Sequence, residues 1–164
     1  YKIYRIFVEF GANENILTDA HPHIGTDKLP GIIDGMERKI VELGGYLIKA
    51  CYLTSDYNGV IEAVDLILKV SDNDLSVLDK ALIKSKKLQA LFKTGNCEEG
   101  LNLANNEIIS VLEESLSKEN NEALAQSLFK AWFDTSVNMI NLYALQGNSK
   151  SIEIADNTSE KNLI

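Results

Sequence analysis

Hydrophobic residues in the first 45 positions recur at helical spacing. Ile3, Ile6 and Phe10 share one helical face, and Gly11 follows them as a typical helix stop. A second apolar stripe begins after Thr26, a suitable N-cap residue, and runs to Gly44-Gly45. Its members are Leu29, Ile32, Ile33, Met36, Ile40 and Leu43. The pattern predicts two helices joined by an irregular segment over residues 13–25.

The next segment has the composition of a β-hairpin. Residues 46–54 are rich in aromatic and apolar side chains, which favours a strand. Ser55-Asp56-Tyr57-Asn58-Gly59 predicts a turn, because Asn-Gly between two apolar runs is typical of hairpins. Residues 60–70 then predict the return strand, although the length of this run also leaves a helix open.

From residue 72 onward the spacing becomes helical again. Three helices are expected: from Asn73 or Asp74 to Gly95, from Asn96 to about Leu116, and from Asn121 to Gln146. Their short connections predict antiparallel neighbours. The expected class is therefore mixed α+β. It divides into an α/β segment at residues 1–71, a helical lobe at 72–147 and a polar tail at 148–164, and no internal repeat is evident.

The composition excludes some classes of function but does not indicate a particular one. The 164 residues carry a formal net charge of −8, which argues against non-specific binding to nucleic acid or to anionic membranes. No apolar run is long enough to predict a membrane span. Two cysteines without a CxxC pair are typical of a reducing compartment, so we expect a cytoplasmic protein.

The segment from Phe7 to Gly45 contains a distinctive order of motifs. A short helix ends in Glu-Phe-Gly-Ala, the residues Pro-His-Ile-Gly-Thr follow, and a helix containing Met36 and Arg38 ends in Gly-Gly. This order resembles a segment of the NAD(FAD)-utilising dehydrogenases, which are FAD-dependent oxidoreductases. The resemblance covers the N-terminal part of the chain, up to about residue 70.

The resemblance implies a position for the cofactor. In that family the strand after Gly-Gly passes the adenine end of FAD, so Leu53 and Thr54 would line the adenine side together with Thr26. No GxGxxG turn follows a predicted strand, and such a turn is what holds dinucleotide phosphates. We therefore interpret the chain as a segment or relative of an FAD-dependent oxidoreductase. We expect that the isolated chain does not hold FAD, and no catalytic residue is assigned.

Two segments are candidates for ion-binding sites. His21-Pro22-His23 offers two imidazoles, but zinc requires three or four ligands, and a loop that shapes the helix entrance explains the same residues. Residues 54–65 follow the outline of a calcium loop, with oxygen ligands at Asp56 and Asn58 and a glycine at Gly59. A hairpin turn is the simpler explanation, so we predict no metal site.

Thiol chemistry has no support in the local sequence, because neither Cys51 nor Cys97 has a histidine positioned beside it.

The last predicted helix supplies the alternative function. Its aromatic and apolar side chains cover a wide arc: Phe129, Trp132, Phe133 and Ile140. A helix apolar over so wide an arc is either central in its lobe or in contact with another chain. The alternative is therefore a non-enzymatic helical interaction module, of an adaptor or chaperone type, whose partner or second copy binds at this arc.

Overall fold

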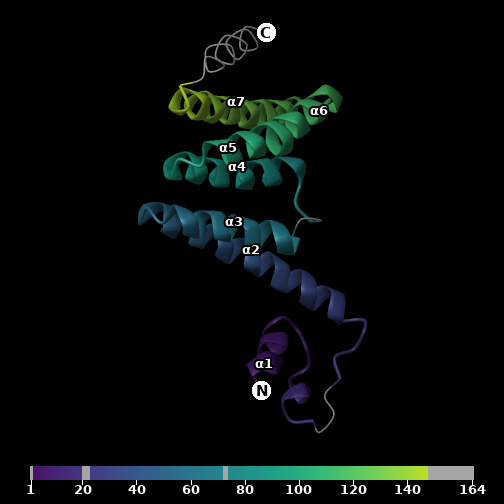
Figure 1. The fold of residues 1–164 in the computed structure, drawn as a ribbon. Coiled ribbons are helices and arrows are strands. Elements are labelled where there is room, and N and C mark those ends of the chain that lie inside the picture. Colours follow the sequence, from purple (N-terminus) through teal and green to yellow (C-terminus); the bar gives the residue numbers. More distant parts are fainter. Residues whose placement is uncertain (1, 20–22, 72–73, 148–164) are drawn as a thin grey trace. The chain divides into compact units, whose positions relative to one another are not determined.

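The computed structural model describes residues 2–19, 23–71 and 74–147 (Figure 1). The predicted tail at 148–164, the histidine loop at His21 and Pro22, and the proposed cap Asn73 lie outside the described residues. Every regular element in the described part of the chain is a helix. The expected α+β class, with its β-hairpin, is therefore wrong, and the fold is all-helical.

The chain forms two compact units that divide after Gly45. Unit 1 contains the helix α1 (Lys2–Glu9), a short 3-10 helix (Glu14–Leu17) and the N-terminal part of α2 (Leu29–Leu53). Unit 2 contains the rest of α2 and every later helix. The helices α3 and α4, on either side of the predicted boundary at residues 71–74, belong to the same unit.

Unit 1 has a small core of its own. Its first helix ends where the sequence predicts, and Gly11 has a positive φ of 102°. The buried residues are Ala12, Ile16 and Ile32, and Met36 packs against them. The predicted stripe on α2 is too wide, because Leu29 and Ile33 are exposed. Only its Ile32–Met36 side is covered.

The helix α2 passes through Gly44-Gly45 instead of ending there. Each glycine costs about 1 kcal/mol in a helix relative to alanine, which does not stop a 25-residue helix. The helix ends at Leu53, where Ser55 adopts a left-handed φ of 58° and Asp56 N–H donates to the Cys51 carbonyl over 2.8 Å. The predicted strand at 46–54 is therefore the last part of a helix and the turn that ends it.

The predicted return strand is the helix α3 (Tyr57–Ser71). Asn58 and Gly59 lie in its first turn, where Gly59 N–H donates to the Asp56 carboxylate over 3.0 Å. Its buried side includes Val60, Val64 and Ile67, a spacing of four and then three residues that fits a helix. Residues 60–70 are apolar at most positions, so their sequence is compatible both with the alternation of a strand and with the periodicity of a helix. In the structure they pack as a helix.

The remaining helices follow the predicted boundaries more closely. They are α4 (Val77–Thr94), α5 (Cys97–Asn102), the π-helix η2 (Leu103–Ile109), α6 (Ser110–Lys118) and α7 (Glu122–Leu145). The α4 cap is Ser76, whose hydroxyl accepts from Asp79 N–H. Asn121 caps α7, as the sequence indicates, by accepting from Leu124 N–H.

The helix α4 is the centre of unit 2. It packs against α3 on one side and against α5, η2 and α7 on the other, and Figure 1 shows this layered order. The core side chains come from all of these later helices, and the fully buried ones include Leu88, Leu91, Ile108, Leu112 and Leu142. Unit 2 is therefore a stack of helices in which each layer covers the previous one.

Candidate functional site

The turns after α2 and α4 have the same geometry. They are Thr54-Ser55-Asp56 and Thr94-Gly95-Asn96. Asp56 N–H donates to the Cys51 carbonyl over 2.8 Å, and Asn96 N–H donates to the Leu91 carbonyl over 3.0 Å. In each turn the threonine hydroxyl also donates to that same carbonyl. Both helices thus end in a Schellman-type turn, with Ser55 and Gly95 at the left-handed position.

The helices that follow these two turns also correspond. The matching buried positions are Val60 and Gly100, Ala63 and Leu103, Val64 and Ala104, Ile67 and Ile108, and Ser71 and Leu112. The spacing grows by one residue after Ala104, inside the π-helix, and a π-helix is the form that an inserted residue takes. Unit 2 therefore contains two copies of one helical hairpin, spaced as in helical repeat arrays, at about 40 residues.

The helix α7 repeats the first helix of these hairpins. The buried pairs between α4 and α7 are Ala81 and Trp132, Ser85 and Ser136, Leu88 and Met139, and Leu91 and Leu142. Ser85 donates to the Ala81 carbonyl over 2.8 Å, and Ser136 donates to the Trp132 carbonyl over 3.0 Å. The helix α7 thus has the same register as the first helices of the two hairpins, which are α2 from Tyr46 onward and α4.

This register identifies one equivalent row of side chains on the three first helices, which we call the first-helix row. Its members are Tyr46, Lys49 and Leu53 on α2, Leu82, Lys86, Gln89 and Lys93 on α4, and Phe133, Val137, Ile140 and Ala144 on α7. All of them are exposed or partly exposed, and Tyr46 and Leu53 are 64% and 78% exposed. Equivalent positions in stacked repeats lie on one side of the array, so the row forms a candidate binding surface.

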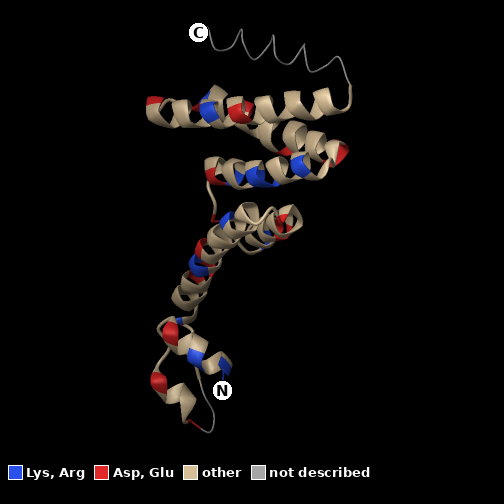
Figure 2. Ribbon diagram, turned by 90° about the vertical axis from the view of Figure 1, so that its left-hand side faces the viewer, with Lys and Arg blue, Asp and Glu red and all other residues tan. Residues whose placement is uncertain are grey.

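The lysines of α4 fall into two groups: some lie in the first-helix row, and others form ion pairs with neighbouring helices of the stack. Figure 2 shows the positive charge of this helix, which carries five lysines. Lys84 pairs with Glu107 at 2.9 Å, and Lys87 pairs with Asp65 at 2.9 Å and with Glu99 at 3.5 Å. Burial lowers the pKa of Lys87, but the hydrogen bonds that Lys87 donates to Asp65 and Glu99, together with the negative charges of these two carboxylates, outweigh burial, so the net pKa is raised. The row itself presents Lys86 and Lys93.

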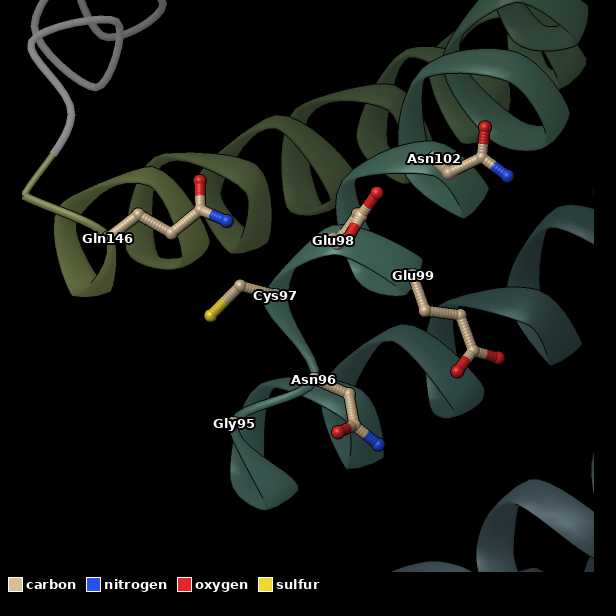
Figure 3. A pocket seen from close by; sticks show the side chains of 7 residues that line it. All are labelled: Gly95, Asn96, Cys97, Glu98, Glu99, Asn102 and Gln146. Atoms are coloured by element: carbon tan, nitrogen blue, oxygen red, sulfur yellow. The ribbon is translucent and has the colours of Figure 1, made fainter.

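A wide, open pocket lies between the start of α5 and the end of α7 (Figure 3). Its volume is about 810 Å³, and its lining is Gly95, Asn96, Cys97, Glu98, Glu99, Asn102 and Gln146. The lining is largely polar, and Cys97 is a free, partly buried thiol. Such an open surface neither excludes water nor positions a base beside the thiol, so its geometry does not describe an active site.

The residues expected at the adenine side lie at opposite ends of α2. Thr26 is exposed in the turn before Leu29, whereas Leu53 is the last residue of the helix. The Thr54 hydroxyl donates to the carbonyls of Ala50 and Cys51. The structure therefore gives Thr54 a role in ending the helix, and it does not bring these three residues together.

The candidate ion-binding and thiol residues have structural roles. The Asp56 carboxylate caps α3, and Asn58 and Gly59 belong to that helix, so residues 54–65 do not form a loop. His23 is exposed. No group of three or more possible metal ligands occurs within the residues described. Burial raises the pKa of the Cys51 thiol, and the nearby Asp56 carboxylate raises it further. Cys51 is therefore held as a thiol.

The aromatic arc of α7 packs largely inside unit 2. Trp132 is buried and donates to the Glu113 carboxylate over 3.1 Å, and its ring stacks on Phe129 at 5.8 Å between centroids. Phe129 and Phe133 are only partly buried, and both pack against the core. Phe133 and Ile140 sit at the edge of this packing, in the first-helix row.

The repeat is a structural feature that the sequence pattern did not reveal. Its signals were the pair of Thr-x-(Asp/Asn) turns and the alanines Ala50 and Ala90 four residues before each turn's threonine. Among the described helices, none has the length and apolar content needed to cross a membrane. A search of family models, curated proteins and solved structures finds no match to this chain.

Proposed function

We propose that unit 2 is a helical-repeat interaction module that binds a segment of another protein along the first-helix row. The single observation that carries the proposal is the shared register of α2, α4 and α7, which lines up exposed side chains from three helices. Stacked helical repeats use such continuous surfaces for binding. This proposal develops the non-enzymatic alternative that the sequence offered.

The chemistry of the row defines the partner. Tyr46, Leu53, Leu82 and Val137 provide exposed apolar area, which suits apolar anchor residues. Lys49, Lys86 and Lys93 stand among them, so acidic side chains fit between the anchors. The expected ligand is a short acidic segment with spaced apolar residues. Of the four α7 residues predicted to contact a partner, only Phe133 and Ile140 lie in the first-helix row, so the proposed contact on α7 consists of these two.

A peptide-display experiment on the full chain tests this proposal. Peptides selected from a random library should combine acidic and apolar residues, and they should bind Lys86→Glu at least about tenfold more weakly than the wild type. Lys118→Glu is the matched control, because Lys118 is an exposed lysine of α6 that lies off the row. Selected peptides that bind all three proteins equally would refute the proposal.

The flavoprotein resemblance remains a second proposal, and the motifs that carry it lie in unit 1. One observation favours it: the compact unit ends at Gly45, the residue at which the resembling order of motifs also ends. We propose that residues 1 to about 70 are related to a segment of an FAD-dependent oxidoreductase, with Thr26, Leu53 and Thr54 as the residues that the resemblance assigns to FAD. Calorimetric titration with FAD is expected to show no binding by this chain, because the Gly-rich phosphate turn is missing. Sub-micromolar binding would contradict that expectation.

A further inference from the structure

The lysines of the first-helix row on α4 specify the conformation of the segment that binds there, on the premise that the row has its proposed function. Lys86 and Lys93 are both exposed and lie seven residues apart. Seven residues are almost two full turns of an α-helix, so both side chains leave the same side of α4. Their Cα atoms are about 10.5 Å apart along the helix axis.

Neither of these two lysines is neutralised within the protein. Lys84 and Lys87 of the same helix pair with carboxylates of neighbouring helices. In contrast, Lys86 and Lys93 form no ion pair with any residue that the structure describes. The Lys93 ammonium lies 5.5 Å from the centroid of the Phe92 ring, a contact that leaves its charge in place. In a chain with a net charge of −8, both lysines are available to an acidic partner.

The distance between the two lysines distinguishes a helical partner from an extended one. Side chains on one face of an extended chain recur every two residues, at about 7 Å and then at about 13 Å. Side chains seven residues apart on an α-helix share a face and lie about 10.5 Å apart, which is the separation of the two lysines. The spacing therefore favours a helix that carries two acidic residues seven positions apart.

The whole stripe on α4 has the spacing of a helix–helix contact. Leu82, Lys86, Gln89 and Lys93 follow one another at intervals of four, three and four residues. Residues that meet a second helix in a coiled coil recur at these intervals. Leu82 is 48% exposed and lies at the end of the stripe nearer the N-terminus of α4, where it offers a contact to an apolar residue of the partner.

Helix dipoles favour one direction for this partner. Acidic residues stabilise the N-terminal end of a helix, and lysines stabilise the C-terminal end. Lys93 lies in the last turn of α4, so the acidic N-terminal end of the partner helix fits beside it. The partner then runs antiparallel to α4. Its first acidic residue meets Lys93, its second meets Lys86, and its apolar residue meets Leu82.

We propose that the first-helix row on α4 binds an amphipathic α-helix of another protein, oriented antiparallel to α4. The spacing of Lys93, Lys86 and Leu82 defines the motif of that helix. The motif has an acidic residue, a second acidic residue seven positions later, and a large apolar residue four positions after that.

The peptides selected against the full chain by display serve as probes, with binding measured by fluorescence anisotropy. They should share the spacing of the motif. Proline in the middle of a selected peptide should weaken binding at least about 100-fold, because proline breaks a helix. Proline at the first helical position is the matched control, and it should change the affinity by less than about twofold, because proline is tolerated there.

The variant Lys86→Glu separates failure of the helical partner from failure of the interaction module. Peptides that bind Lys86→Glu more weakly than the wild type, yet tolerate the central proline, would overturn the helical partner and leave the interaction module standing. Peptides that bind Lys86→Glu as tightly as the wild type would overturn both.

A charge exchange tests which acidic residue meets which lysine. Replacing the first acidic residue of the peptide with lysine should weaken binding to the wild type about tenfold, and Lys93→Glu should restore it. Lys86→Glu is the matched control and should not restore binding of this peptide. Circular dichroism should show equal helix content in both variants. Restoration by Lys86→Glu instead, or by neither variant, would overturn the antiparallel contact.

Discussion

The two complete hairpins of unit 2 share a turn and a buried register, but they differ in their surroundings. In the second hairpin, α4 lies between α3 and the later helices, and the face around Lys87 and Ala90 is covered. In the first hairpin, the equivalent face of α2 at Leu47 and Ala50 is open. The comparison shows that local sequence specifies the hairpin, whereas the neighbouring layer determines whether a given face is core or surface.

The hairpins also differ by one residue. The second helix of the second hairpin accommodates an extra residue in η2, where the Asn105 side chain donates to the Leu101 carbonyl over 2.9 Å. A π-helix interrupts the regular backbone ladder, and this amide satisfies a carbonyl at the interruption. The buried positions on either side therefore keep the spacing that α3 has without an insertion.

Deleting one residue from each hairpin should give the largest difference in stability between the two hairpins. Removing Asn106 should convert η2 into a regular α-helix with the spacing of α3, so the free energy of unfolding should change by only about 1 kcal/mol. Removing its counterpart Leu66 should rotate Ile67 and Ser71 by about 100° away from the core and cost at least about 3 kcal/mol.

Urea denaturation of both deletion variants measures these values. Leu66 and Asn106 are both exposed, so the side chains themselves account for little of the difference. Equal destabilisation by the two deletions would show that η2 is not an insertion relative to α3, and that the register of the two hairpins is not shared.

The sequence predicted the later helices better than the first hairpin, for a physical reason. Gly95 and Gly147 follow clear helical stripes, and both have a positive φ, so the ends of α4 and α7 could be located. The end of α2 carries Ser55 in the same conformation, and serine gives no comparable signal. Gly44-Gly45 gave a false signal, because glycines inside a long helix lower its stability without ending it.

The candidate site was predictable only in part. Phe133 and Ile140 were identified from the width of the apolar arc on α7, and the structure leaves both partly buried, with Phe133 packed against the core. The contributions of α2 and α4 depend on the alignment of three helices. The extra residue in η2 and the longer second hairpin hide that alignment from a search at one fixed period.

A smaller change in stability should result from replacing Lys87 with leucine, the residue found at the equivalent position 47 of the first hairpin. Replacing Lys87 with leucine makes the second hairpin resemble the first, but it leaves Asp65 without its ion pair, and we expect a loss of about 1–2 kcal/mol. The control Lys86→Leu, at an exposed position, should change stability by less than about 0.5 kcal/mol.

The pH dependence of the same variant follows from the raised pKa of Lys87. A group with a raised folded-state pKa stabilises the fold fully below its unfolded pKa of about 10.4, and the contribution disappears as the pH rises through the folded value. The stability difference between wild type and Lys87→Leu should therefore be constant near neutral pH and shrink above about pH 10. A difference that persists unchanged at higher pH would assign the loss to packing instead of the ion pair.

The smallest expected effect compares the two turns. Gly95 has a φ of 76°, so Gly95→Ala forces a Cβ into the left-handed region and should cost about 1 kcal/mol, although no other atom lies close to that Cβ. Ser55 has a φ of 58° and already bears this cost, so Ser55→Gly should stabilise the protein by about 0.5 kcal/mol after the entropy of glycine is counted. Opposite signs in thermal unfolding would confirm that the two turns are equivalent. If both substitutions destabilised the protein, Ser55 would have a stabilising contact that Gly95 lacks, and the equivalence of the turns would be limited to the backbone.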